Sequence, residues 1–314
     1  MNAPLDHGAV WAVVVNWNGG DWNLRCLAAA QAAGVKSANI VVVDNGSTDG
    51  SAERIAAEFP AAALLRMGEN LGFGEAANRG ATHALAAGAE ALLLLNNDLE
   101  LGRAALDLLI AELNAHPRTG ACGPRLLLPG EPVRIWAAGG RLDHAQNIST
   151  LLGFGRPDGP PWNERQTVDY VVGAALCVRS QAWRQMDGLR ADYFAYMEDV
   201  ELGLRLRKAG WECVSVGAAS AVHHPSSSTG GGYSPRRKYM QAVNSVRFLR
   251  EYGDTRAWLR FWWFDVASLA PALAAGLVSG QAKGVMAKAA GLWHGMNGGR
   301  VEAERLEPGR GPFW

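Results

Sequence analysis

The stretch IVVVDNGSTDG (residues 40–50) joins four apolar residues to a polar turn that begins with Asp44. A short run of β-branched residues is typical of a strand that is covered on both faces of a parallel sheet. Similar runs occupy residues 10–15, 64–66 and 91–95, and a polar cluster follows each of them. Because the carboxyl ends of parallel strands meet at one edge of the sheet, we expect these clusters to form a ligand site there.

Helical patterns fill the gaps between these strands. The sequence predicts helices over residues 22–33, 52–58, 74–87 and 103–115, with Ser51 as the cap of the second. Strands that alternate with helices indicate βαβ units, and therefore an α/β fold with a mostly parallel central sheet flanked by helices.

The pattern changes after residue 123. Residues 125–161 are rich in glycine and proline, which predicts hairpins and a mobile loop over the site. Beyond them we expect a strand over residues 168–178, a helix over 198–208, a strand over 211–216 and an amphipathic helix over 235–252.

Composition narrows the class of protein. The 314 residues are 48% hydrophobic and 19% charged, which excludes a disordered chain and a coiled coil. The 30 basic side chains balance the 30 acidic ones. With no net charge, the protein has no overall electrostatic field that attracts nucleic acid. An anionic ligand therefore has to be bound by a local group of residues. The four cysteines lack CxxC spacing and are expected in the core, in a reducing compartment. The first residues do not read as a signal peptide, so we expect a cytoplasmic protein.

Two aspartates flank the turn that follows residue 43. Asp44 ends the expected strand, where its carboxylate either accepts hydrogen bonds from a base or ribose or helps to build the turn. Asp49 is expected to be a turn or capping residue and not a ligand contact.

Asn96, Asn97 and Asp98 end the apolar run LLLL. A single carboxylate with amide neighbours at this edge suits a hard divalent cation that keeps several waters and takes further ligands from a diphosphate. Helix capping is the alternative, but Leu99 and Glu100 intervene before the next helix. We therefore favour a metal site.

Glu198 and Asp199 stand together at the start of an expected helix, one turn before Glu201 and Arg205. Acids at a helix N-terminus compensate the helix dipole, and Glu201 is spaced to pair with Arg205. The alternative is a general base. The preceding aromatic segment would partly desolvate one carboxylate and raise its affinity for a proton.

His223 and His224 precede a loop rich in serine and glycine. An imidazole here is either structural or completes a metal site with Asp98. The hydroxyls and amides of residues 226–232 either bind phosphate or belong to a flexible linker.

These pieces stand in a fixed order: NWNGG, DNGSTDGS, ENLGFGEAANRG, LLLLNNDLEL, the segment that contains MEDVELGLRLRKAGW, and VHHPSSSTGG. Over about residues 10–252 the series resembles the inverting family 2 glycosyltransferases of the GT-A fold, especially bacterial rhamnosyltransferase-like members that build polysaccharides. The resemblance implies a catalytic domain over residues 1–234, with a nucleotide-sugar half to about residue 123 and an acceptor half after it. A C-terminal helical region over residues 235–314 follows.

The resemblance also implies site residues. Those expected to bind the substrate, besides Glu198, are Asn16, Asp44, Asn70, Gly72, Asn78, Asn96 and Asn97. The DXD motif of the family stands here as NND, so only Asp98 is a charged ligand for Mg²⁺ or Mn²⁺. The late histidine of the family corresponds best to His223, with His224 as the alternative. The ED motif of the family corresponds to Glu198 and Asp199, with the second acid as the base.

The implied reaction is a single displacement. Asp199 takes a proton from an acceptor hydroxyl while the metal stabilises the departing nucleoside diphosphate, and the configuration inverts. We expect a dTDP- or UDP-sugar donor, with rhamnose first, and a glycan or lipid-linked acceptor in surface polysaccharide or lipopolysaccharide assembly. A nucleotidyltransferase and an inactive nucleotide-sugar-binding protein are the alternatives. The hypothesis requires Asp44, Asp98, Asp199 and His223 to converge on one pocket.

The C-terminal region contains the aromatic cluster WLRFWW (residues 258–263) beside two arginines. Tryptophan with arginine favours a bilayer interface, and peripheral contact with the inner face of the cell membrane is expected. Packing against the catalytic domain or a homodimer contact would use the same residues. A true membrane span over residues 261–279 is disfavoured, because Asp265 and Pro271 interrupt it.

Overall fold

The computed structural model describes residues 4–144, 147–225 and 234–306. The strands are β1 (Val10–Asn16), β2 (Ile40–Asp44), β3 (Ala63–Arg66), β4 (Ala91–Asn96), β5 (Leu99–Leu101), β6 (Thr119–Leu128), β7 (Arg134–Ala137), β8 (Gly140–Leu142), β9 (Ser149–Leu151), β10 (Arg165–Val168), β11 (Ala175–Arg179) and β12 (Glu212–His223). The α-helices are α1 (Trp22–Ala32), α2 (Ser51–Glu58), α3 (Phe73–Ala86), α4 (Ala105–Ala115), α5 (Ser180–Met186), α6 (Glu198–Lys208), α7 (Pro235–Tyr252), α8 (Thr255–Phe261), α9 (Leu269–Ser279), α10 (Ala282–Met296) and α11 (Ala303–Leu306). Short 3-10 segments are η1 (Ser37–Asn39) and η2 (Ala191–Tyr193), and η3 (Trp262–Val266) is π-helical.

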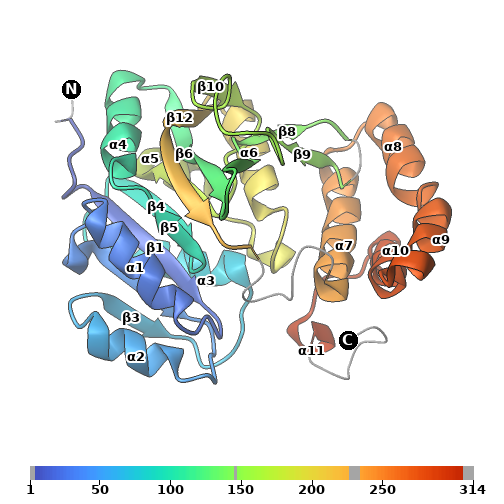
Figure 1. Ribbon diagram of the computed structural model, residues 1–314, viewed down its shortest axis with the longest axis horizontal. Helices are drawn as coiled ribbons and strands as arrows, with labels where there is room; N and C mark the ends of the chain where they lie inside the picture. Colours follow the sequence, from blue (N-terminus) through green and yellow to red (C-terminus); the bar gives the residue numbers. More distant parts are fainter. Residues whose placement is uncertain (1–3, 145–146, 226–233, 307–314) are drawn as a thin grey trace.

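The main sheet has the strand order β10-β12-β6-β11-β4-β1-β2-β3 (Figure 1). Strands β1 to β4 pair in parallel, as predicted, and β6 pairs in parallel with β12. Strand β11 runs antiparallel to both β4 and β6, and β10 runs antiparallel to β12. The sheet is therefore mixed, and most of its strands share one direction.

The side chains of each strand alternate between two buried layers. In β1, Val13 packs in the layer that contains the alanines of α3, whereas Val14 packs in the layer of α1 and α4. Both faces of the sheet are thus covered, as the valine runs predicted. The four cysteines are buried and free, which confirms their predicted place in the core.

Three local predictions need correction. The apolar run 168–178 is not one strand: β10 ends at Val168 and β11 begins at Ala175, because an apolar run alone does not distinguish a strand from a buried loop. Strand β12 continues to His223, well beyond residue 216. Ser51 is the first helical residue of α2, after Gly50 in the left-handed conformation, and provides no side-chain cap.

The C-terminal helices gather at one end of the molecule, beyond the β8–β9 hairpin (Figure 1). By length and composition alone, the helical segment Thr255–Ser279 could cross a membrane, and 17% of its apolar window is buried. Asp265 is one of the two residues that interrupt the apolar run 261–279. It is buried and forms an ion pair with Lys288, at 2.6 Å between Oδ1 and Nζ.

Candidate active site

A cavity of about 870 Å³ lies at the carboxyl edge of the sheet. Its wall includes Asp98, Asp199 and His223, which come from three distant parts of the chain. The predicted convergence of these three residues on one pocket is confirmed. Asp44 lies behind the wall, and its neighbour Asn45 takes part in the lining.

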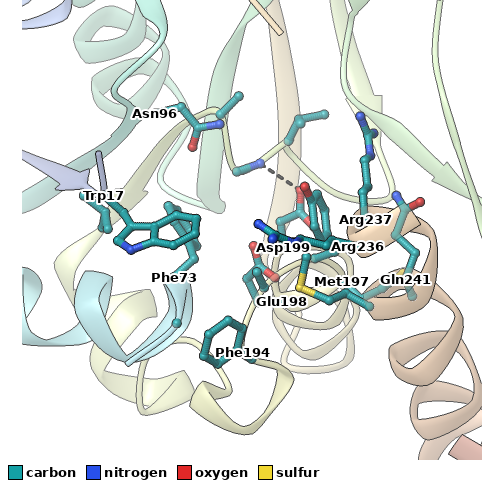
Figure 2. A pocket seen from close by; sticks show the side chains of 18 of the residues that line it. Trp17, Phe73, Asn96, Phe194, Met197, Glu198, Asp199, Arg236, Arg237 and Gln241 are labelled. Carbon is teal, nitrogen blue, oxygen red and sulfur yellow. Dashed lines mark hydrogen bonds between the residues drawn. The ribbon is translucent and has the colours of Figure 1, made fainter. Parts of the chain in front are cut away.

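The cavity has two chemically different ends, with Glu198 and Asp199 between them in the view of Figure 2. The aromatic end consists of Trp17, Asn45, Asn70 and Phe73. The basic end, on the first two turns of α7, consists of Arg236, Arg237, Lys238 and Gln241. A flat apolar wall suits the ring system of a base, and guanidinium groups suit phosphate.

Behind the aromatic end, Asn16 is the centre of a buried hydrogen-bond network. Its Nδ2 donates to Asp44 Oδ1 at 2.9 Å and to Ser51 Oγ at 2.8 Å. Its Oδ1 accepts from Asn23 Nδ2 at 2.7 Å. Asn16 has no exposed surface, so in this structure it holds Asp44 and the turn in place. Direct substrate contact by Asn16 and Asp44 stays a prediction.

Asn45 fixes the NLGFG segment at the same end. Its Nδ2 donates to Asn70 Oδ1 at 2.9 Å, and its Oδ1 accepts from the amide of Leu71 at 2.9 Å. Gly72 has φ of +84°, and a Cβ there would lie 2.6 Å from the carbonyl oxygen of Phe194. Only glycine fits this close approach without strain.

Asn78 ties helix α3 to the segment that follows α5. Its Nδ2 donates to the carbonyl of Leu189 at 2.8 Å, and its Oδ1 accepts from the amide of Leu189 at 2.9 Å. This position is outside the cavity lining, so nucleotide contact by Asn78 also stays a prediction. Asn96 and Asn97, by contrast, both line the cavity beside Asp98.

Strand pairing brings His223 to Asp98. His223 lies opposite Leu99 in the β12–β5 register, and its Nε2 is 3.2 Å from Asp98 Oδ1. His224 points elsewhere: its ring lies against that of Trp22, with 4.4 Å between centroids and a tilt of 33°, and its Nε2 is 3.1 Å from Glu100 Oε1. The geometry therefore favours His223 over His224 as a metal ligand.

The Asp98 and His223 pair fits a divalent cation. His223 is buried, its ring packs edge-on against Trp136, and its Nδ1 has no hydrogen-bond partner within the described residues. Within those residues no group of three or more His, Cys, Asp and Glu side chains is placed to hold a metal ion. A cation here would take its other ligands from substrate and water, which is usual for Mg²⁺ and Mn²⁺ at diphosphates.

Glu198 and Asp199 open α6, and their environments differ. Asp199 accepts two backbone hydrogen bonds, from the amide of Gly173 to Oδ2 and from the amide of Val200 to Oδ1, both at 2.8 Å (Figure 2). Glu198 is buried, and its Oε2 has no hydrogen-bond partner among the described residues. Burial and the adjacent Asp199 raise the pKa of Glu198 to about 8. Burial also raises the pKa of Asp199, against the two amide donors.

The turn before these acids has an unusual backbone. Phe194, Tyr196 and Met197 all have positive φ, which costs free energy in residues other than glycine. Asn244 of α7 holds this turn: its Nδ2 lies 2.8 to 2.9 Å from the carbonyl oxygens of Tyr193, Ala195 and Tyr196. Helix α7 thus fixes the direction from which Glu198 and Asp199 enter the cavity.

Several lining residues escaped the sequence reasoning. Trp17 stands next to Asn16 in the NWNGG motif, and three consecutive cations open the amphipathic helix 235–252, so both signals were present. The predicted hairpins in residues 125–161 are confirmed as β6–β7 and β8–β9, and Ser149 and Leu151 of β9 line the cavity. The proposed phosphate role of residues 226–232 lies outside the described residues. The predicted ion pair between Glu201 and Arg205 is confirmed at 2.6 Å.

Comparison with known families decides the class of this site. The model of glycosyl transferase family 2 matches residues 11–180, and that of glycosyl transferase family group 2 matches residues 163–297. The chain belongs to glycosyltransferase family 2. It is therefore an enzyme that transfers sugars, as the resemblance implied.

A curated relative of this glycosyltransferase comes from Mycobacterium tuberculosis (strain ATCC 25618 / H37Rv). It is an N-acetylglucosaminyl-diphospho-decaprenol L-rhamnosyltransferase, 32% identical over 243 residues, in an alignment that covers 69% of this chain and 76% of the relative. The rhamnosyltransferase-like character of the glycosyltransferase is thus supported by an aligned relative as well as by its motifs.

Solved structures of glycosyltransferases share the fold. Mannosyltransferase PcManGT from Pyrobaculum calidifontis, in complex with GDP-Man and Mn²⁺, has a TM-score of 0.52 at 15% identity, over 92% of this chain and 87% of that one. GalNAc-T7 with UDP, GalNAc and Mn²⁺ has a TM-score of 0.57 at 14% identity, over 76% and 50%. At such identities the likeness shows the fold alone, and it confirms the predicted GT-A architecture of this glycosyltransferase.

Proposed function

We propose that this glycosyltransferase transfers a sugar, with L-rhamnose the first candidate, from a dTDP- or UDP-sugar to a hydroxyl of a lipid-linked glycan, with inversion at the anomeric carbon. One observation supports this most: Asp199 lines the cavity between the aromatic and basic ends and is held by two amide donors. The M. tuberculosis relative, whose name gives L-rhamnose and a diphospho-decaprenol acceptor, supports the choice of substrates. The product would enter surface polysaccharide or lipopolysaccharide.

Asp199 is the proposed base. Two adjacent carboxyl groups in one buried site do not both ionise readily, and the group with more hydrogen-bond donors keeps the charge. Asp199 has the amides of Gly173 and Val200, whereas the raised pKa keeps Glu198 protonated at neutral pH. Asp199 takes the proton of the acceptor hydroxyl as that oxygen bonds to the anomeric carbon. The nucleoside diphosphate departs with the electrons of the bond that breaks.

Asp98 and His223 would hold Mg²⁺ or Mn²⁺, which would neutralise charge on the departing diphosphate. The two side chains are adjacent at 3.2 Å, and both line the cavity with Asn96 and Asn97. Trp17 and Phe73 would hold the base at the aromatic end. In this proposal residues 1–234 form the catalytic domain, with the nucleotide-sugar half to about residue 123 and the acceptor half after it, and α7 adds the basic end of the cavity.

Apolar residues of the C-terminal helices form a second surface, the tail face, defined by Trp262, Trp263, Leu277 and Val278. Trp263 is 72% exposed and Val278 is 92% exposed. We assign this face to peripheral contact with the cytoplasmic side of the cell membrane, where a lipid-linked acceptor resides. Liposome flotation tests this: the wild type should float and the Trp263→Glu/Val278→Glu variant should not. A homodimer that the double variant dissociates, without flotation of either protein, would assign the face to a second copy.

The variant Asp199→Asn tests the reaction. An amide cannot accept the proton at neutral pH, so transfer should fall by roughly 10³-fold, the scale of general base catalysis. Nucleotide affinity, measured by calorimetry, should change less than threefold, because the aromatic end is intact. Loss of more than 90% of nucleotide affinity, or transfer above a tenth of wild type, would remove Asp199 from this role. Product that carries nucleotide in place of sugar would identify a nucleotidyltransferase, and nucleotide-sugar bound by the wild type without turnover would identify a binding protein.

A further inference from the structure

The basic end places three consecutive cations at the cavity wall. Arg236, Arg237 and Lys238 form the first turn of α7 after Pro235, and Gln241 follows one turn later. All four side chains are partly buried. A helix N-terminus also directs its free amides and positive dipole outward, so the dipole adds to the positive charge of the side chains.

Protein carboxylates do not balance the two arginines. Among the ion pairs of the described residues, neither Arg236 nor Arg237 has an acidic partner. The Nε of Arg236 is buried without a hydrogen-bond partner in the described part of the chain, and the guanidinium of Arg237 lies over the Tyr196 ring, 5.4 Å from its centroid. Burial, with Lys288 and Arg237 nearby, lowers the pKa of Lys238.

Such an arrangement costs free energy unless an anion enters. A desolvated arginine without an acidic partner, as at Arg236 and Arg237, is unfavourable, and an arginine fork matches the oxygens of phosphate in pairs. An anionic group with several oxygens, such as a diphosphate, would fill these unmet donors. The basic end therefore has the chemistry of a diphosphate site.

Two diphosphates are candidates, one on the donor and one on the acceptor. In the proposed function, Asp98 and His223, near the asparagines that end β4, would hold the metal for the donor diphosphate. In Figure 2, Arg236, Arg237 and Gln241 project from the side of Glu198 and Asp199 opposite Trp17 and Phe73. In the proposed reaction Asp199 takes the proton of the acceptor hydroxyl, so the acceptor lies against Asp199. Groups on the side of Asp199 away from the nucleotide are therefore placed to contact the acceptor.

The surroundings of the basic end fit the same assignment. Helix α7 lies between the catalytic sheet and helices α8 to α10 (Figure 1). The tail face belongs to this outer group, on η3 and α9. Asp265, next to the tail face, accepts a hydrogen bond from the backbone amide of Asn147, which lines the cavity. A lipid diphosphate held by α7 would thus have its sugar toward Asp199 and its chain toward an apolar surface.

We propose that Arg236, Arg237 and Lys238 form a subsite for the diphosphate of a lipid-linked acceptor, separate from the site of the donor diphosphate. This assignment rests on the proposed function in one respect, the position of Asp199 as the base. It predicts that the enzyme binds a nucleoside diphosphate and a short prenyl diphosphate at the same time.

Binding experiments test the subsite without turnover. Calorimetry with a C10 prenyl diphosphate is performed on full-length protein saturated with Mn²⁺ and either dTDP or UDP. Wild type should bind the prenyl diphosphate, and Arg236→Gln/Arg237→Gln should bind it roughly 100-fold more weakly, with nucleotide affinity unchanged. The matched control, Arg103→Gln/Arg184→Gln, removes two exposed arginines outside the cavity lining and should behave as wild type.

Other outcomes of the calorimetry would contradict the acceptor subsite. Competition between the prenyl diphosphate and the nucleotide, or loss of nucleotide affinity in the Arg236→Gln/Arg237→Gln variant, would assign the cations to the donor. Equal prenyl diphosphate affinity in that variant and the wild type would exclude the subsite.

Kinetics separate this proposal from the proposed function. A sugar linked to prenyl diphosphate is compared with the same sugar as a prenyl glycoside without phosphate. Wild type should favour the diphosphate acceptor at least tenfold in kcat/KM, and the Arg236→Gln/Arg237→Gln variant should lose that preference. Transfer by wild type without any preference would overturn the subsite alone, whereas absence of transfer to either acceptor, with the binding results intact, would overturn the proposed function alone.

Discussion

The two ends of the cavity are stabilised in opposite ways. Behind the aromatic end, Asn16, Asp44 and Asn45 are buried and hydrogen-bonded to other residues of the protein. At the basic end, Arg236 has a buried Nε without a partner within the described residues, and Glu198, between the two ends, has a buried oxygen without one. The first end is formed before any ligand arrives, while the second has polar groups that a ligand would satisfy.

This difference indicates where binding energy is used. A preformed wall binds the nucleotide without reorganisation, which favours affinity. Polar groups without a partner in the free enzyme form hydrogen bonds or ion pairs when the acceptor binds. Acceptor binding therefore contributes to the stability of the reactive complex. Substitutions at the two ends should therefore affect stability differently.

The variant Asn16→Ala should produce the largest loss of stability. It removes the donor to Asp44 and Ser51 and the acceptor of Asn23, and takes from the buried Asp44 carboxylate its side-chain donor. Each unmet buried group costs about 1–3 kcal/mol, so we expect a loss of about 3 kcal/mol in the free energy of unfolding, measured in urea. Arg236→Gln is the comparison from the basic end and should leave stability equal or higher. A similar loss in both variants would show that the two ends do not differ.

The variant Asp98→Ala tests how much donor affinity depends on the metal site. With Mn²⁺ present, nucleoside diphosphate affinity should fall roughly 100-fold in Asp98→Ala and in His223→Ala, and EDTA should reduce the affinity of wild type to the same value. His224→Ala is the matched control, because His224 contacts Trp22 and Glu100 outside the cavity lining. Wild-type affinity that is equal with Mn²⁺ and with EDTA would contradict a metal at this pair.

Local patterns predicted most of the regular structure. The valine runs predicted β1 and β2, and the leucines before Gly210 predicted α6. The charge spacing predicted the ion pair between Glu201 and Arg205. These features depend on neighbours within a few residues, which the sequence displays directly. The prediction of a single strand over residues 168–178 was wrong because a buried loop can be as apolar as a strand.

Contacts between segments that are distant in the sequence were harder to predict from local patterns. The choice between His223 and His224 depends on the β12–β5 register, because a shift of one residue reverses the face on which a side chain lies. The direction of Asp199 depends on positive φ angles at Phe194 and Met197, and neither is a residue that indicates such a conformation. The cations of α7 follow the pattern of a solvent-facing helix end, and only the packing of α7 brings them to the cavity.

The variant Glu198→Gln tests the buried carboxyl group between the two ends, and over one pH unit its predicted effect is the smallest. Glu198 has a folded-state pKa of about 8, above its ordinary value, because it is buried beside Asp199. Between pH 5 and 8 the unfolded chain has released this proton and the folded chain still holds it, so wild-type stability falls as pH rises, by at most about 1.4 kcal/mol per pH unit. Glutamine has no proton to lose, so the stability of the variant relative to wild type should increase from pH 6 to pH 7 and level off above pH 8. A constant difference over this range would mean that Glu198 is already ionised in the folded enzyme, and Asp199 would then not be the carboxylate that keeps the charge.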